Sequence, residues 1–330
     1  MMEKVLQPGV IEHKERKMVS WLKRFSTLVG LFLICLVLSL SSEHFLSIEN
    51  FLNILLQNAN IAILAVGMTL VIILGEIDLS VGGVEALGCV VAAWMMVYGG
   101  LGIIPSIILA LIAGTLCGVV SGFFVAYFRF HSFVSTLAMM GISRGLALIY
   151  THGASIYGLP DSFRFIGQGS LGPIAVPVLI AAAVLLLGHL LLTQFRLGNH
   201  IYAVGGNIEA ARLAGINVGR VKLVVLSVSG FCGALAGVIM ASRLNSGQGT
   251  IGDADLMDTI ASVIIGGTSL LGGVGTIPGT IIGVLVIGVI RNGLNLLGVS
   301  SFWQMVAIGV IIICAVLVDE IRRRLQEKER

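Results

Sequence analysis

Long apolar segments dominate this chain and restrict it to a membrane-spanning fold. Hydrophobic residues make up 57% of its 330 residues and charged residues only 11%, whereas a soluble domain carries about 25% charged residues. The mean hydropathy is +1.03. A water-soluble chain of this length could not cover so much apolar surface. The composition therefore predicts an all-α polytopic membrane protein.

Ten apolar segments are close to the length that crosses a bilayer, which is roughly 17–25 residues. They lie near residues 26–42, 52–74, 82–98, 102–128, 132–150, 174–193, 222–242, 256–271, 277–297 and 302–318. The third, eighth and last are short. We therefore expect a bundle of eight to ten transmembrane helices with broken, tilted or re-entrant segments. Residues 71–83 and 263–273 are weakly alike, which hints at an internal repeat.

This pattern divides the chain into three parts. Residues 1–25 form a polar tail, residues 26–318 form a single transmembrane domain with a polar loop at 194–222, and residues 319–330 form a basic tail. No cleavage signal follows the first apolar segment, so it is interpreted as an anchor helix.

The distribution of Lys and Arg predicts the orientation. If the N-terminus is cytoplasmic and ten spans alternate, sixteen of the twenty basic residues fall on the cytoplasmic side, as the positive-inside rule requires. Six carboxylates then fall outside: Glu43, Glu49, Asp161, Asp253, Asp255 and Asp258. We expect both termini in the cytoplasm.

Several functions are disfavoured by what the sequence lacks. The five cysteines all lie in apolar runs without a CxxC pair, and the histidines form no metal motif, so we expect neither disulfides nor a metal site. No basic patch indicates nucleic acid. Residues 247–252 fit GxGxxG but follow a membrane span instead of a strand, so we reject a dinucleotide site. The dipeptide Gly-Lys never occurs, which excludes a P-loop for ATP.

Ionisable and amide side chains inside the spans are the candidates for a translocation path, because such groups are costly in lipid and usually face a cavity or a partner. They are Asn58, Asn60, Glu76, Asp78, Arg144, Arg291, Asn292 and Asn295. The structural alternative is that the charged groups tie the bundle together through buried pairs, Asp78–Arg144 or Asp78–Arg291. Both interpretations remain open from the sequence.

A polar island at residues 205–222 interrupts the apolar pattern. Asn207 is a good N-cap, Glu209 suits the first turn and Arg212 the last, and Gly215 suits the left-handed stop position. These residues predict a helix of about two turns at 208–214. Because so short a helix is marginal alone in water, we expect it to dock on a partner, with a plain solvated loop as the alternative.

Four blocks of sequence resemble one family. Glu209, Ala210 and Ala211 followed by Gly215 and Ile216 resemble the EAA–x3–G pattern of importer permeases of the ATP-binding-cassette class. The segment GEIDLSVG at 75–82 resembles a signature of the ribose-type sugar permeases. Residues 131–145 and 258–304 resemble two further blocks. The resemblance covers about 45–318, and Glu76 and His131 depart from it where glycine and proline are usual.

The resemblance implies a non-catalytic permease subunit in a bacterial inner membrane. It would move a ribose-like monosaccharide or a similar polyhydroxylated solute by alternating access. ATP would be bound by a separate, tandem-domain ATPase docked on Asn207, Glu209–Ala211, Gly215 and Ile216, so the chain itself needs no cofactor. The other implied partners are an external solute-binding protein, a second permease copy or paralogue, and membrane lipid.

Three alternatives stay open. An ion- or proton-coupled secondary carrier would use Glu76 and Asp78 as titrating groups. A permease of the same architecture could carry amino acids or nucleosides. An intramembrane enzyme lacks any catalytic set in the sequence. The sequence does not name the solute.

Overall fold

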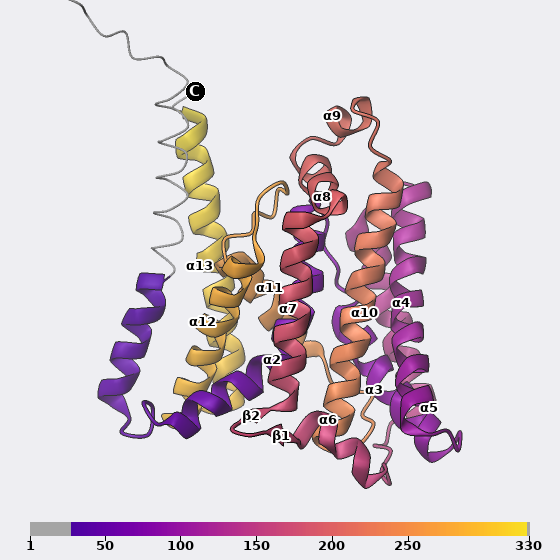
Figure 1. The fold of residues 1–330 in the computed structure, drawn as a ribbon. Coiled ribbons are helices and arrows are strands. Elements are labelled where there is room, and N and C mark those ends of the chain that lie inside the picture. Colours follow the sequence, from indigo (N-terminus) through magenta and orange to yellow (C-terminus); the bar gives the residue numbers. More distant parts are fainter. Residues whose placement is uncertain (1–27, 329–330) are drawn as a thin grey trace, which may run out of the picture.

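The chain folds into a bundle of helices, as the sequence predicts (Figure 1). The computed structural model describes residues 28–328; the predicted tail at 1–25 lies outside them. The long elements are a helix at Leu28–Ser41, then α2 (Ile48–Ile73), α3 (Val81–Val97), α4 (Ile103–Tyr127), α5 (Ser132–Thr151), α7 (Val176–Gln194), α10 (Val218–Leu244), α11 (Asp253–Ile265), α12 (Ile277–Leu296) and α13 (Ser301–Lys328). Each of the ten predicted spans corresponds to one of these helices.

Within the described part of the chain, six helices are long and apolar enough to cross a membrane: α2, α4, α5, α7, α10 and α12. The helix at Leu28–Ser41, α3 and the Ser301–Cys314 part of α13 are shorter apolar helices, and α11 has 13 residues. The expectation of about ten helices, some of them broken, is confirmed. α13 also continues through most of the segment expected to be a basic tail.

Short elements mark the two ends of the bundle (Figure 1). One end carries α8 (Arg196–Gly206) and α9 (Ile208–Leu213) and is called the α9 end. The other carries a 3-10 turn at Asp161–Phe163, α6 (Arg164–Gln168) and the antiparallel strands β1 (Ser170–Leu171) and β2 (Ile174–Ala175), and is called the hairpin end. The sequence did not predict α8 as a helix.

Two helices begin inside the bundle. After α2 ends at the α9 end, residues 74–80 return toward the centre and α3 then runs to the hairpin end. After α10 ends at the hairpin end, residues 245–252 return toward the centre and α11 then runs to the α9 end (Figure 1). The first turns of α3 and α11 meet where Gly82 contacts Gly252. α3 and α11 are short because each spans only part of the bundle.

These two units are inverted copies of one arrangement. α10 packs on α3 and α4, just as α2 packs on α11 and α12, and α5 and α13 cover α3 and α11 respectively. In this arrangement the segment that corresponds to 74–80 is 245–252, whereas residues 263–273, which are weakly like 71–83 in sequence, lie at the other end of α11. Asp253, Asp255 and Asp258, which the sequence predicts to lie outside, are all in the first two turns of α11, where Asp258 is buried.

Glycines allow the central helices to touch through their backbones. A Cβ atom on Gly118 of α4 would overlap the Leu226 carbonyl of α10, and one on Gly237 of α10 would overlap the Glu85 carbonyl of α3. Lipid supplies no hydrophobic force between helices, so such close contacts are a main source of their attraction. The small-residue spacing in the sequence thus serves packing.

The packing role predicts a difference between two glycines. Gly118→Ala should destabilise the protein by about 1–3 kcal/mol, the usual cost of overpacking. Gly141→Ala on α5, where a Cβ would meet nothing within 4 Å, should leave stability unchanged or raise it, since alanine is the better helix former. Thermal unfolding in detergent measures both. Equal losses in the two variants would contradict the packing account.

Candidate functional site

The short helix predicted in the polar island is present as α9. The Asn207 side chain caps it by accepting a hydrogen bond from the Ala210 N–H at 2.9 Å. Glu209 in its first turn and Arg212 in its last pair at 2.8 Å, and Gly215 leaves the helix at a φ of +81°. The local signals in the sequence therefore describe this helix correctly to within one residue.

One face of α9 is anchored and the other is free. Ala211 is buried, and Ile208 and Ile216 pack with it in a cluster that includes residues of α2, α8 and α10. The opposite face points outward, and the Leu213 side chain is 90% exposed. The Leu213 side chain is therefore available for contact with a partner protein.

The base of this protrusion touches the ends of the central helices. In α8, the Tyr202 hydroxyl donates to the Gly275 carbonyl at 2.7 Å, and burial raises the pKa of Tyr202. Gly205 packs on Ile73, the last residue of α2, and the Gly273 N–H donates to the Ile73 carbonyl at 2.7 Å. Movement of α8 would therefore reach both α2 and the loop at 266–276.

Hydroxyl groups satisfy the broken backbone between α2 and α3. The Ile77 N–H donates to Ser132 Oγ and the Leu79 N–H to Thr136 Oγ1, each at 3.1 Å. Asp78 is buried and accepts from the Ser80 N–H at 2.8 Å and from Ser229 Oγ of α10 at 2.7 Å. The predicted pairs of Asp78 with Arg144 or Arg291 are wrong, because hydroxyl and N–H donors already hold the carboxylate.

Both arginines pair with carboxylates of α11 instead. Arg144 donates to the Gly249 carbonyl at 2.8 Å and to the Ile251 carbonyl, and it forms an ion pair with Asp253. It thereby satisfies the broken backbone before α11, as Ser132 and Thr136 do before α3. Arg291 of α12 holds the buried Asp258 through a hydrogen bond of 2.8 Å. The prediction that charged groups join the helices through ion pairs is therefore correct for both arginines, but their carboxylate partners lie on α11 and not at Asp78.

The remaining candidates for a translocation path do not gather around one cavity. Glu76 forms an ion pair with Lys222 of α10, and both side chains are mostly buried. Asn292 exchanges two hydrogen bonds with Asn50, at 2.7 and 3.0 Å. Asn58 donates to the Ile54 carbonyl within α2 at 2.7 Å, and Asn295 accepts from Gln304 at 2.7 Å. These contacts join helices or cap backbone groups.

Asn60 differs, because it bridges two carboxylates where α3 and α11 meet. Its Nδ2 donates to Glu85 of α3 at 2.7 Å and to Asp255 of α11 at 2.9 Å. The prediction did not include Glu85 or Asp255 in the path. The sequence did contain a pattern that could have identified these two residues, because each is an acidic residue near the start of an unusually short span.

One carboxylate near this junction is open to the surroundings. The Asp253 side chain is 77% exposed, and Met257 one turn later is 56% exposed. An exposed charge is costly where it faces lipid. We therefore expect the surface around Asp253 and Arg144 to face water or another protein, which makes it a candidate for a path wall.

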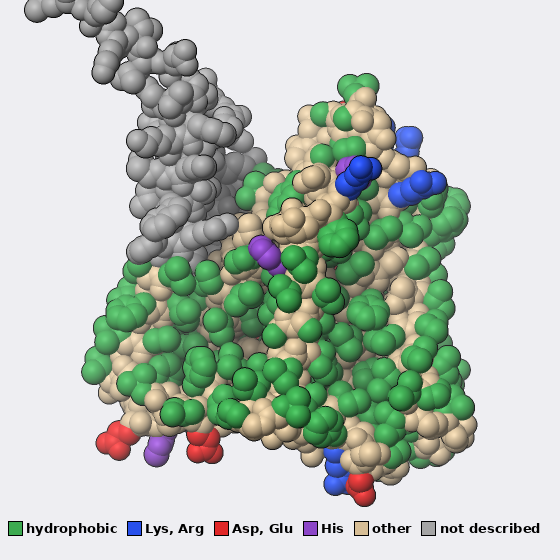
Figure 2. All heavy atoms as spheres, viewed as in Figure 1, with side chains coloured by type: hydrophobic (Ala, Val, Ile, Leu, Met, Phe, Trp, Pro, Cys, Tyr) green, Lys and Arg blue, Asp and Glu red, His purple; other side chains and the backbone are tan. Residues whose placement is uncertain are grey.

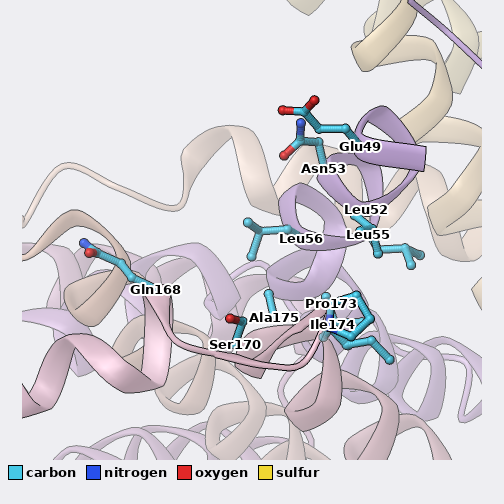
Figure 3. A pocket seen from close by; sticks show the side chains of 11 residues that line it. Glu49, Leu52, Asn53, Leu55, Leu56, Gln168, Ser170, Pro173, Ile174 and Ala175 are labelled. Atoms are coloured by element: carbon cyan, nitrogen blue, oxygen red, sulfur yellow. The ribbon is translucent and has the colours of Figure 1, made fainter. Parts of the chain in front are cut away.

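A shallow cavity of about 310 Å³ lies elsewhere, at the hairpin end (Figure 3). Leucines of α2, Pro173 and Ile174 line it, with Glu49 and Gln168 at its margin. It is mostly apolar and does not contact Asn60, Glu85 or Asp253. Among the described residues, no three His, Cys, Asp or Glu side chains are grouped so that they could hold a metal ion.

Comparison with known proteins decides the family. Residues 50–316 match the family described as Branched-chain amino acid transport system / permease component. The chain belongs to this family. It is 44% identical to the Ribose import permease protein RbsC of Haemophilus influenzae, over 88% of this chain and 91% of that protein. The resemblance to importer permeases inferred from the four sequence blocks is thereby confirmed.

Two further relatives give the same result. The chain is 44% identical to Ribose import permease protein RbsC of Escherichia coli (strain K12), over 91% of this chain and 94% of that protein. It is 34% identical to the Xylose transport system permease protein XylH of the same organism, over 85% and 87% respectively. No solved structure matches the chain.

The ion pairs of this permease predict unequal costs. Arg291→Met strands the carboxylate of Asp258, which is 1% exposed, and should destabilise the protein by about 3–5 kcal/mol. Arg164→Met breaks a pair in which the arginine is 46% and Asp161 89% exposed, and should cost about 0–1 kcal/mol. Chemical or thermal unfolding in detergent measures the difference. Similar losses would show that the Arg291 pair is not structural.

Proposed function

We propose that this chain is the membrane-spanning subunit of an ATP-binding-cassette importer for a pentose such as ribose. It transports solute through alternating access and leaves ATP hydrolysis to a separate subunit. The observation that carries the proposal is the capped, protruding helix α9 with its exposed Leu213, in a member of a transport-permease family. The following paragraphs give the support for the solute, the ATPase contact and the other partners.

The relatives favour a pentose as solute. The names of the relatives described above refer to ribose and xylose, two neutral sugars of similar size that carry several hydroxyl groups. The family description refers to branched-chain amino acids instead. The alternative of an amino-acid or nucleoside permease is less well supported, because the ribose permeases match this chain along 88–91% of its length.

The ATPase would bind at the α9 end. Asn207, Glu209, Ala210, Ala211, Gly215 and Ile216 form or support the helix. We infer that Leu213, together with the exposed sides of Glu209 and Arg212, enters a groove on the ATPase, as slim amphipathic helices do. α8 then connects this contact to α2 and to the loop at 266–276 through Gly205 and Tyr202.

Charge supports a cytoplasmic location for the α9 end. Figure 2 shows Lys and Arg side chains near this end, whereas acidic side chains lie at the opposite end, where Arg164 is paired with Asp161. The α9 end includes Arg196, Arg212 and Arg220, whereas Glu43 and Glu49 flank the start of α2 at the hairpin end. By the positive-inside rule the hairpin end faces the outside of a bacterial inner membrane. The solute-binding protein would dock there, on the 151–175 segment.

A second copy or a paralogue would complete the path. The open surface around Asp253, Arg144 and Met257 cannot remain against lipid. Two such surfaces facing each other would enclose a polar route for a sugar.

The alternative of a secondary carrier receives little support from Glu76 and Asp78. Lys222 already neutralises Glu76, and serine hydroxyls hold Asp78. Both carboxylates are therefore held by partners within the bundle. In an ATP-driven importer, α9 would be the contact with the ATPase. A secondary carrier has no such subunit and would need no docking helix.

Reconstitution tests the proposal. The permease is placed in proteoliposomes with its ATPase and solute-binding protein, and uptake of labelled ribose, xylose and leucine is measured with and without ATP. We expect ATP-dependent uptake of a pentose and none of leucine. ATP-dependent leucine uptake alone would move the assignment to the amino-acid alternative. Pentose uptake that needs a proton gradient and no ATP would overturn the importer mechanism.

The same preparation tests the α9 contact. Leu213→Glu should weaken ATPase binding at least tenfold, about 1.4 kcal/mol or more, and reduce uptake accordingly. Leu171→Glu is the matched control, because this side chain is 59% exposed at the hairpin end. It should leave ATPase binding unchanged. If both variants bind the ATPase normally, α9 is not the coupling helix.

A further inference from the structure

The junction of the two half-spanning helices holds two carboxylates next to each other. Glu85 lies in the second turn of α3 and is fully buried, and Asp255 lies in the first turn of α11 and is partly buried. Both accept hydrogen bonds from one nitrogen, Nδ2 of Asn60, at 2.7 and 2.9 Å. Because the two oxygens share one donor atom, they are within about 6 Å of each other.

Two of the three cations near this pair already have carboxylate partners elsewhere. The charged groups near this pair on neighbouring elements are Asp78 before α3, Arg144 on α5, Arg243 on α10, Asp253 and Asp258 on α11, and Arg291 on α12. Arg144 pairs with Asp253, and Arg291 with Asp258. Among the described residues, Arg243 forms no ion pair within 4 Å, and it interacts with Asp255 only at longer range. Two ionised carboxylates at this junction would therefore repel each other without a cation in contact.

The helix ends do not remove this repulsion. A helix N-terminus favours negative charge, but its influence falls off within the first turn. Glu85 lies beyond the first turn of α3. At α11, Asp253 precedes Asp255 and occupies the same end of the helix.

Two buried acceptor atoms at the junction lack a donor. Glu85 Oε2 and Asn60 Oδ1 have no hydrogen-bond partner, and their residues are 0% and 3% exposed. Unpaired buried acceptors are costly. A hydrogen ion on Glu85 would turn one of these acceptors into a donor and remove one of the two negative charges. A single proton would supply both the donor and the charge reduction.

We propose that Glu85 and Asp255, with Asn60 between them, form a proton-binding site that holds one shared proton and joins α3 to α11. The partly exposed Asp255 provides the route by which the proton enters and leaves, whereas Glu85 has no contact with solvent. Loss of the proton would leave two facing carboxylates and push the first turns of α3 and α11 apart. The site does not depend on which solute is carried.

Infrared spectroscopy of the purified chain tests the site directly. The wild-type protein at neutral pH should show the C=O stretch of a protonated carboxyl group at this junction, and this component of the spectrum should be lost in Glu85→Gln and in Asp255→Asn. Glu209→Gln, which changes an exposed carboxylate on α9, should keep the band. A spectrum unchanged in Glu85→Gln would overturn the proposal. If Glu85→Gln does not fold, Asp255→Asn replaces it in this test, and a spectrum unchanged in that variant would likewise overturn the proposal.

The pH dependence of unfolding provides a second readout. An unfolded Glu has a pKa near 4.3, so above that pH the folded state alone keeps the proton. The stability from this proton is fully present below about pH 4.3 and is lost as the pH rises, with the folding equilibrium falling about tenfold per pH unit while only the folded state is protonated. Glu85→Gln should lack this component. The same pH dependence in both proteins would contradict the site.

A cation is the competing ligand. Stabilisation of the wild type by sodium at constant pH, absent from Glu85→Gln, would replace the proton with a metal ion and overturn the proposal. None of these measurements requires transport. A negative result would therefore reject the proton site without affecting the importer assignment, and a negative uptake experiment would not affect the proton site.

Discussion

The bundle depends on satisfying backbone polar groups where helices break inside a membrane. Lipid offers no hydrogen bonds, so every interrupted turn must find donors and acceptors in the protein. At 74–80, the N–H groups that lack a helical partner donate to the hydroxyls of Ser132 and Thr136 and to the carboxylate of Asp78. At 245–252, Arg144 donates to the carbonyls. These contacts make two half-spanning helices stable, and with them a polar junction near the middle of the fold.

The helices that form this junction are also linked to α9 through α8. The end of α2 contacts Gly205 of α8, and the loop after α11 contacts Tyr202. Glu76, just after α2, is paired with Lys222 of α10. A displacement of α8 is thus applied to the segment that leads into α3 and to the loop that follows α11. Glycine contacts between α3, α4 and α10 bring the backbones into direct contact. We therefore expect these helices to follow the displacement together.

The sequence predicted well whatever depends on local patterns. Apolar length located the ten helices, and Asn207, Glu209 and Gly215 located α9 because capping chemistry is local. It predicted poorly what depends on partners far along the chain. Arg144 was expected to meet Asp78, but it meets Asp253, since nothing in the spacing shows that residues 245–252 turn back into the bundle. Glu85 was missed for the same reason: its neighbours Asn60 and Asp255 are brought together only by the fold.

The central claim is that force on α9 reaches the broken helices through α8. Tyr202→Phe tests it most directly, because it removes only the hydrogen bond to Gly275 and leaves α9 unchanged. ATP hydrolysis and sugar uptake are measured together in the reconstituted complex. The account predicts normal ATPase binding and hydrolysis with several-fold less sugar transported per ATP. An unchanged ratio of transport to hydrolysis would contradict it.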